Sequence, residues 1–187
     1  MDKSWVSIFD DCIKSYQGDV IEIGAGIGET TEYLAKIAKQ YSKKVLVIDP
    51  FEDYWDNMPE SYGRPYPYDK FKKNVLERYD NVILFKTHSG DENLPSKLKD
   101  YGPISFAFVD GLQYEENVMQ DLRLMDILKV THVALDDFTR NTEISQVPRA
   151  VEKFIRLGTY QVLGQFPRTN ERTIGLLKRN DSINTST

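Results

Sequence analysis

The chain has 187 residues, with 24 lysines and arginines against 29 aspartates and glutamates, which gives a net charge of −5. A chain of this length can bury one core without disulfides or a structural metal, so we expect a single domain over residues 1–180 and a flexible polar tail over 181–187. No apolar run approaches the roughly 20 residues that a membrane span needs, and the basic residues are scattered. We therefore expect a cytoplasmic protein with a small-molecule partner, and neither nucleic acid nor membrane partners.

Along the chain, predicted strands alternate with predicted amphipathic helices. Short apolar runs predict strands at 19–24, 44–49, 81–86, 104–110 and 132–137, and amphipathic segments predict helices at 29–41, 68–79, 94–101 and 115–129. This alternation is typical of βαβ units with a parallel sheet buried on both faces. A helix at 148–158, with Pro148 suited to its first turn, precedes two directly joined strands at 159–166 and 172–179. The predicted fold is an α/β, Rossmann-like open sandwich with an antiparallel C-terminal hairpin.

One long segment without a predicted element, residues 51–68, is rich in aromatic side chains. Loops beyond about 12–15 residues are usually functional or disordered. We expect a lid or pocket wall here, and the alternative is a loop packed on the sheet edge.

A glycine loop follows the first predicted strand, with Gly24, Gly26 and Gly28. Open α/β sheets bind ligands at such loops, but the third glycine of the dinucleotide fingerprint is replaced by Glu29. Glu22 is poorly placed beside a pyrophosphate and suits a ligand with positive charge, such as an ammonium or a sulfonium. The loop therefore predicts a nucleoside ligand without phosphates and disfavours a dinucleotide oxidoreductase. A tight turn without a ligand is the alternative.

Further polar residues follow the second and third strands. Asp49 stands about 20 residues beyond the loop, where an acid can accept hydrogen bonds from ribose hydroxyls, and after Pro50 comes Phe51, which can face an adenine. Asp91 can accept the adenine amine or cap the following helix. His88 can act as a base or flank the adenine.

The segments VIEIGAGIGETTEYLA, VLVIDPF, FVDG and VALDDF, followed by PRAVEKF and the hairpin, resemble the class I S-adenosylmethionine-dependent methyltransferases. Within them the chain is most similar to small metal-associated O-methyltransferases related to the macrocin O-methyltransferase group, from about Gly18 to Lys178. The resemblance implies a seven-stranded sheet whose last strand is antiparallel, and S-adenosylmethionine as the cofactor. The residues expected to contact it are Glu22, Gly24, Ala25, Gly26, Gly28, Thr30, Asp49, Pro50, Phe51, Asp91 and Asp110.

In such relatives the fourth strand ends in an acid and the fifth in paired acids. Here these are Asp110, Asp136 and Asp137, which the resemblance places as ligands of Mg²⁺, a cation that prefers oxygen ligands. The ion would hold a substrate hydroxyl, so these three acids, together with His88, are the expected catalytic residues. Gln113 stands where one form of the family pattern has histidine, which leaves the identity of the base open. A polar strand end is the alternative for the paired acids.

Other residues have plainer interpretations. His132, at the start of the fifth strand, and Cys12, in an N-terminal helix, are expected to be structural. Arg140, Arg149 and Arg168 either grip an acidic group of the acceptor or lie on the surface.

The predicted function is transfer of a methyl group to an oxygen of a small molecule, with or without a divalent metal. The alternatives are a metal-independent N-, C- or protein methyltransferase and a non-catalytic nucleoside-binding protein. We expect a pocket that is either shallow or completed by a second chain, and the second alternative would make the protein a homodimer.

Overall fold

The computed structural model describes residues 4–51, 68–139, 142, 145–168 and 172–180. The expected tail at 181–187 and most of the expected lid, residues 52–67, lie outside the described residues. Within the described ranges, no helix is long and apolar enough to cross a membrane.

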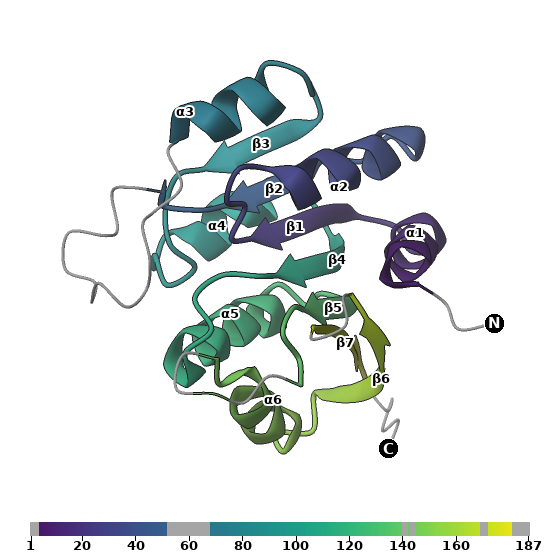
Figure 1. Ribbon diagram of the computed structural model, residues 1–187, viewed down its shortest axis with the longest axis vertical. Coiled ribbons are helices and arrows are strands. Elements are labelled where there is room, and N and C mark those ends of the chain that lie inside the picture. Colours follow the sequence, from purple (N-terminus) through teal and green to yellow (C-terminus); the bar gives the residue numbers. More distant parts are fainter. Residues whose placement is uncertain (1–3, 52–67, 140–141, 143–144, 169–171, 181–187) are drawn as a thin grey trace, which may run out of the picture.

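Seven strands form one sheet in the order β3-β2-β1-β4-β5-β7-β6 (Figure 1). The strands are β1 (Asp19–Ile23), β2 (Val45–Ile48), β3 (Val82–Phe85), β4 (Ile104–Val109), β5 (His132–Leu135), β6 (Tyr160–Pro167) and β7 (Thr173–Arg179). The first five are parallel, while β7 runs antiparallel to both β5 and β6. The predicted fold class is confirmed, including the C-terminal hairpin.

Helices cover both faces of this sheet (Figure 1). They are α1 (Trp5–Ser15), α2 (Glu29–Gln40), α3 (Tyr68–Phe71) with the π-helical turn η3 (Lys72–Leu76), α4 (Leu94–Lys99), α5 (Glu115–Ile127) and α6 (Val147–Ile155). Side chains of α1, α2, α3 and η3 form the core on one face, and side chains of α4, α5 and α6 form the core on the other. As expected, Pro148 lies in the first turn of α6.

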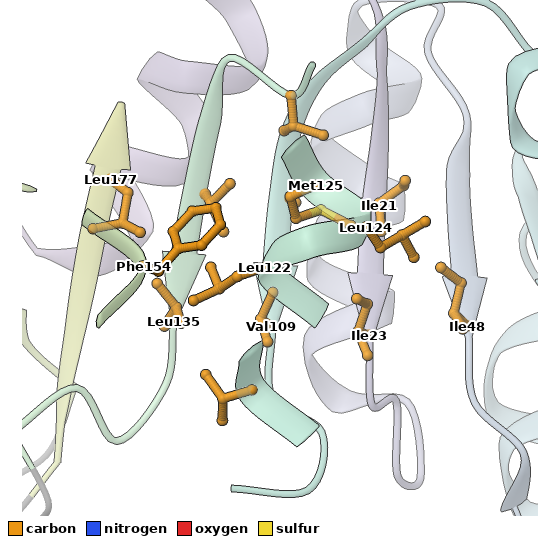
Figure 2. Close-up of a cluster of buried hydrophobic side chains, with 14 of the residues drawn as sticks. Ile21, Ile23, Ile48, Val109, Leu122, Leu124, Met125, Leu135, Phe154 and Leu177 are labelled. Carbon is orange, nitrogen blue, oxygen red and sulfur yellow. The ribbon is translucent and has the colours of Figure 1, made fainter. Parts of the chain in front are cut away.

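Two-residue alternation along the strands divides the apolar side chains between these cores. Ile21 and Ile23 of β1 face the helices α4 to α6, whereas Val20 packs on the side of α1 and α2. Figure 2 shows the first of these clusters, in which Leu122 and Met125 of α5 lie over the strands. Because both faces are covered, the central strands are apolar almost throughout, which is why they read as continuous runs.

The predicted helix at 68–79 is shorter and less regular than expected. Four residues of α-helix pass into the wider π-helical turn η3, which packs against the glycine loop. Asn74 donates to the carbonyl of Ile27 at 2.9 Å, and Val75 lies so close that a Cβ at Gly28 would come within 2.2 Å of its Cγ2. Packing against the loop thus takes precedence over helical regularity.

The strand order reverses between β1 and β4, since the chain moves outward from β1 to β3 and then returns to the other side. Ligands of open α/β sheets bind at this point, beyond the carboxyl ends of the strands. The glycine loop and the residues that follow β2, β3, β4 and β5 all lie on this edge.

Candidate active site

A cavity of about 620 Å³ opens at this edge. Its walls come from the glycine loop, from the segments after β2, β3 and β4, from α5 and from the end of the β6–β7 hairpin. The predicted site residues that line it are Glu22, Gly24, Ala25, Gly26, Thr30, Asp49, Pro50, Phe51, His88, Asp110 and Asp137. Three others, Gly28, Asp91 and Asp136, lie outside its lining.

The glycine loop has backbone angles that favour glycine. Gly24, Gly26 and Gly28 have φ angles of 82°, 55° and 93°, in the left-handed region. A Cβ at Gly24 would lie 2.3 Å from the carbonyl oxygen of Asp110, so β1 and β4 meet there without room for a side chain. Gly28 is instead the N-cap of α2 and packs on η3, which gives it a structural role and no contact with the cavity.

Asp49 joins the end of β2 to the glycine loop. Its Oδ2 accepts hydrogen bonds from the amides of Ala25 at 2.8 Å and Gly26 at 3.3 Å, and its Oδ1 accepts one from the amide of Phe51 at 2.7 Å. The carboxylate is therefore held at the cavity wall by backbone donors. Phe51 has a φ of 51° and is only 2% exposed, packed against Tyr68.

Glu22 lies at the cavity with a fully buried side chain. Neither of its carboxylate oxygens has a hydrogen-bond partner among the described residues. Burial raises the pKa of Glu22 to about 8. The neighbouring hydroxyl of Thr31 opposes this effect, and the charges of Asp110 and Asp49 add to it. A buried carboxyl group without a partner is costly, and a cationic ligand group would relieve the cost.

The two polar residues expected after β3 have different positions. His88 lines the cavity, and its Nδ1 accepts from the amide of Gly90 at 3.2 Å. Asp91 accepts hydrogen bonds from the amide of Asn93 and the hydroxyl of Thr87, and the Asn93 bond contributes most to lowering its pKa. The N-cap of α4 is Asn93, without a side-chain capping bond, so Asp91 forms a turn ahead of the helix rather than capping it. Asp91 also lies outside the cavity lining, where the adenine-binding prediction would need it.

A further acid at the cavity is Asp121, which the sequence analysis did not single out. It projects from α5, is 3% exposed, and accepts a hydrogen bond from the hydroxyl of Ser89 at 2.5 Å. Burial raises the pKa of Asp121 to about 7. The sequence could have indicated this residue by its spacing, because Asp121 shares an otherwise apolar helix face with Val118, Leu122 and Met125.

The acids after β4 and β5 lie beside two arginines of the β6–β7 hairpin. Arg168 Nη1 is 2.5 Å from Asp136 Oδ2 and 3.2 Å from Asp110 Oδ2. Arg172 is 3.6 Å from Asp136 and 3.5 Å from Asp137. Burial raises the pKa values of Asp110 and Asp136, and the positive charge of Arg168 opposes this effect.

These residues do not fit the expected Mg²⁺ site. Across the described ranges, no group of three histidine, cysteine, aspartate or glutamate side chains is arranged to hold a metal ion. Arg168 contacts Asp110 and Asp136, so a cation bridging the same oxygens would lie beside a guanidinium of like charge. The physical reason for the departure is that the hairpin brings its arginines to the ends of β4 and β5.

The remaining expectations concern single residues. His132 is 3% exposed and packs on the ring of Tyr16, and burial lowers its pKa to about 4. Cys12 is buried in the core, so both residues occupy structural positions, as expected. Arg149 is exposed on α6, and Arg140 lies outside the described residues. Of the two arginines that the structure describes, Arg168 lines the cavity.

Comparison with known proteins supports a methyltransferase. The family model described as a methyltransferase domain matches residues 21–138, more than half of the chain. Among solved structures, the calicheamicin-biosynthesis enzyme CalS11, a TDP-rhamnose 3′-O-methyltransferase, is similar with a TM-score of 0.67 and 17% identity, over 94% of this chain and 78% of that one.

Two further structures have the same fold. An O-methyltransferase from Bacillus cereus in complex with SAH gives a TM-score of 0.62 at 16% identity, over 93% of this chain and 78% of that one. A type 11 methyltransferase from Sulfolobus solfataricus, described as putative, gives 0.60 at 16% identity, over 96% and 91%. No curated protein sequence matched the chain.

The family match contains the glycine loop, the Asp49 strand end and the acids after β4 and β5, which meet at one cavity. The donor set around the cavity fits the cofactor of this family, because Glu22 offers a buried carboxyl group with no hydrogen-bond partner among the described residues. Gly24 lets the loop pass against the backbone of Asp110, where a Cβ would clash. The chain belongs to the S-adenosylmethionine-dependent methyltransferases.

Proposed function

We propose that this protein transfers a methyl group from S-adenosylmethionine to an oxygen atom of a small-molecule acceptor. The observation that carries the proposal is the buried carboxyl group of Glu22, which faces the cavity beside the glycine loop without a partner among the described residues. The cavity volume of about 620 Å³ falls within the range of small-molecule sites. The O-methyltransferases among the structural neighbours, and the sequence likeness to the macrocin group, support oxygen as the acceptor atom.

Each wall of the cavity has a distinct task in this proposal. The carboxyl group of Glu22 would bind the ammonium of the cofactor's methionine moiety, and Asp49 would bind the ribose hydroxyls. The cofactor supplies a methyl group that is already bonded to a good leaving group. The protein must therefore align the acceptor oxygen with that carbon, exclude water and take up the acceptor's proton.

We assign the proton uptake to Asp137. The bond from the acceptor oxygen to the methyl carbon forms as the carbon–sulfur bond breaks, S-adenosylhomocysteine leaves, and the hydroxyl proton passes to a carboxylate. Asp137 lines the cavity and has a φ of 49°, a strained backbone angle of the kind that clusters at functional sites. Asp136 lies outside the lining and contacts Arg168, so it serves as a matched comparison.

Binding is the first test of this proposal. Calorimetric titration with S-adenosylhomocysteine should show saturable binding to the wild-type protein, with NADH as the negative control. Gly24→Asp should abolish this binding, since even a Cβ there would meet the backbone of Asp110 at 2.3 Å. Unimpaired binding by a folded Gly24→Asp variant would show that the glycine loop is not the cofactor site.

Turnover is the second test, with methyl-labelled S-adenosylmethionine and a panel of hydroxylated, amino and peptide acceptors. The proposal expects methyl ethers or esters as products. It also expects Asp137→Asn to lower kcat more than Asp136→Asn, with S-adenosylhomocysteine binding retained. Labelled amines or peptides instead would overturn the oxygen assignment, and binding without turnover on any acceptor would favour the non-catalytic alternative.

A further inference from the structure

Arg168 lies between the acids that follow β4 and β5. It comes directly after β6, and its Nη1 contacts Asp136 at 2.5 Å and Asp110 at 3.2 Å. The side chain of Asp136 has no exposed surface, and that of Arg168 is 20% exposed. This is a largely buried ion pair rather than a surface contact, so its geometry is restrained by the packing around it.

Several elements hold the Arg168 side chain in this position. Its guanidinium carbon lies 5.6 Å from the ring of Trp5 in α1 and 5.6 Å from the ring of Phe108 in β4. Its Nη2 donates to the hydroxyl of Thr30 in α2 at 3.3 Å. Aromatic faces attract guanidinium groups, and the planar fork can serve several acceptors at once. The site is thus shaped around an arginine.

The hairpin brings a second guanidinium to the same acids. The amide of Arg168 donates to the carbonyl of Arg172 at 2.9 Å, which fixes these two residues opposite each other. Arg172 is 3.5 Å from Asp137 and 3.6 Å from Asp136. Three carboxylates therefore face two positive charges, that of the largely buried Arg168 and that of the more exposed Arg172, and a divalent cation would meet repulsion from both.

We infer that the guanidinium groups of Arg168 and Arg172 take the place of a divalent metal ion, and that methyl transfer by this protein requires no metal. In this arrangement Arg168 is a positioning residue: it contacts Asp110 and Asp136, while Asp137 lines the cavity and contacts Arg172. The inference rests on the proposed function for its activity test only, because metal binding can be measured without turnover.

The metal-binding test uses the full chain after chelator treatment, with Mn²⁺ as the probe in calorimetry and thermal unfolding. Wild-type protein should bind no Mn²⁺ at the acids and keep its unfolding midpoint. Arg168→Ala should lower the midpoint by about 10 °C, since it leaves buried carboxylates uncompensated, and Mn²⁺ should then bind and restore part of the loss. Arg168→Lys should retain the exclusion of Mn²⁺, and Arg123→Ala, at an exposed position on α5, should behave as the wild type.

Wild-type binding of Mn²⁺ that Asp136→Asn abolishes would overturn the inference, and this comparison stands even if Arg168→Ala does not fold. In the activity test, turnover should persist in excess chelator, and loss of turnover restored by Mg²⁺ would equally overturn it. Failure of the wild type to bind S-adenosylhomocysteine would contradict the proposed function instead. The Mn²⁺-binding comparison would still decide whether Arg168 and Arg172 take the place of a metal ion.

Discussion

Replacing Glu22 with glutamine should stabilise the ligand-free protein at neutral pH. The native pKa of about 8 lies well above the ordinary value of 4.5, so the folded protein must take up a proton that the unfolded chain releases. This cost is absent when the pH is below the pKa of Glu22 in the unfolded chain. It grows as the pH rises and reaches its full size when the pH is above the pKa in the folded protein. At about pH 7 it amounts to about 3 kcal/mol, since one pKa unit corresponds to about 1.4 kcal/mol. Glutamine resembles the protonated acid in shape and has no such cost.

The assay is urea unfolding of the wild type and of Glu22→Gln across the pH range. The free energy of unfolding of the variant should exceed that of the wild type at about pH 7, and the difference should vanish at about pH 4, which provides an internal control. S-adenosylhomocysteine should bind the variant more weakly, because the favourable partner of its ammonium is gone. Parallel stability curves for the two proteins would show that Glu22 has no raised pKa, and would refute the argument that its burial is offset by a ligand.

Three further results are expected. Asp49→Asn should weaken S-adenosylhomocysteine binding by about tenfold or more in calorimetry, as the loss of a charge-assisted hydrogen bond implies, and unchanged affinity would contradict its assigned role. Gly175→Ala should lower the free energy of unfolding by about 1–3 kcal/mol in urea, because a Cβ would lie 1.8 Å from the ring of Phe138; an unchanged midpoint would show that the ring can move aside. His132→Leu should flatten the acid limb of the stability curve. The pKa of His132 is about 4 in the folded protein and 6.5 in the unfolded chain, so below pH 6.5 the unfolded chain binds a proton that the folded protein does not, and the wild type loses stability. If stability falls with acid equally steeply in the variant, His132 is not the cause.

Local patterns predicted the architecture because each pattern corresponds to a local physical requirement. The apolar runs at β1, β2 and β4 predicted strands covered on both faces, and Pro148 suited the first turn of a helix, where the structure places it. The same patterns were weaker at 68–79, where a helical period did not show the π-helical turn. Within that turn Val75 packs against Gly28, a contact between residues far apart in the sequence that a local period does not show.

The site was predictable where it depends on one loop. The glycine spacing, with Glu22 before it and Asp49 at the next strand end, identified the cavity wall from residues close in sequence or set by the strand period. Asp121 was missed because its helix face reads as apolar core, and only the fold brings that face to Ser89. Periodicity describes one element at a time, so it does not show which polar side chains from different elements meet.

The sequence by itself determined the α/β sandwich, its antiparallel ending and the location of the glycine loop, since strand and helix periods and backbone requirements are encoded by neighbouring residues. Only the tertiary structure decided what surrounds the acids of β4 and β5. Arg168 is 58 residues from Asp110 and 32 from Asp136, and the sheet order places the hairpin beside β5. The charge balance of the site therefore depends on strand order, because electrostatic partners are set by distance in space rather than along the chain.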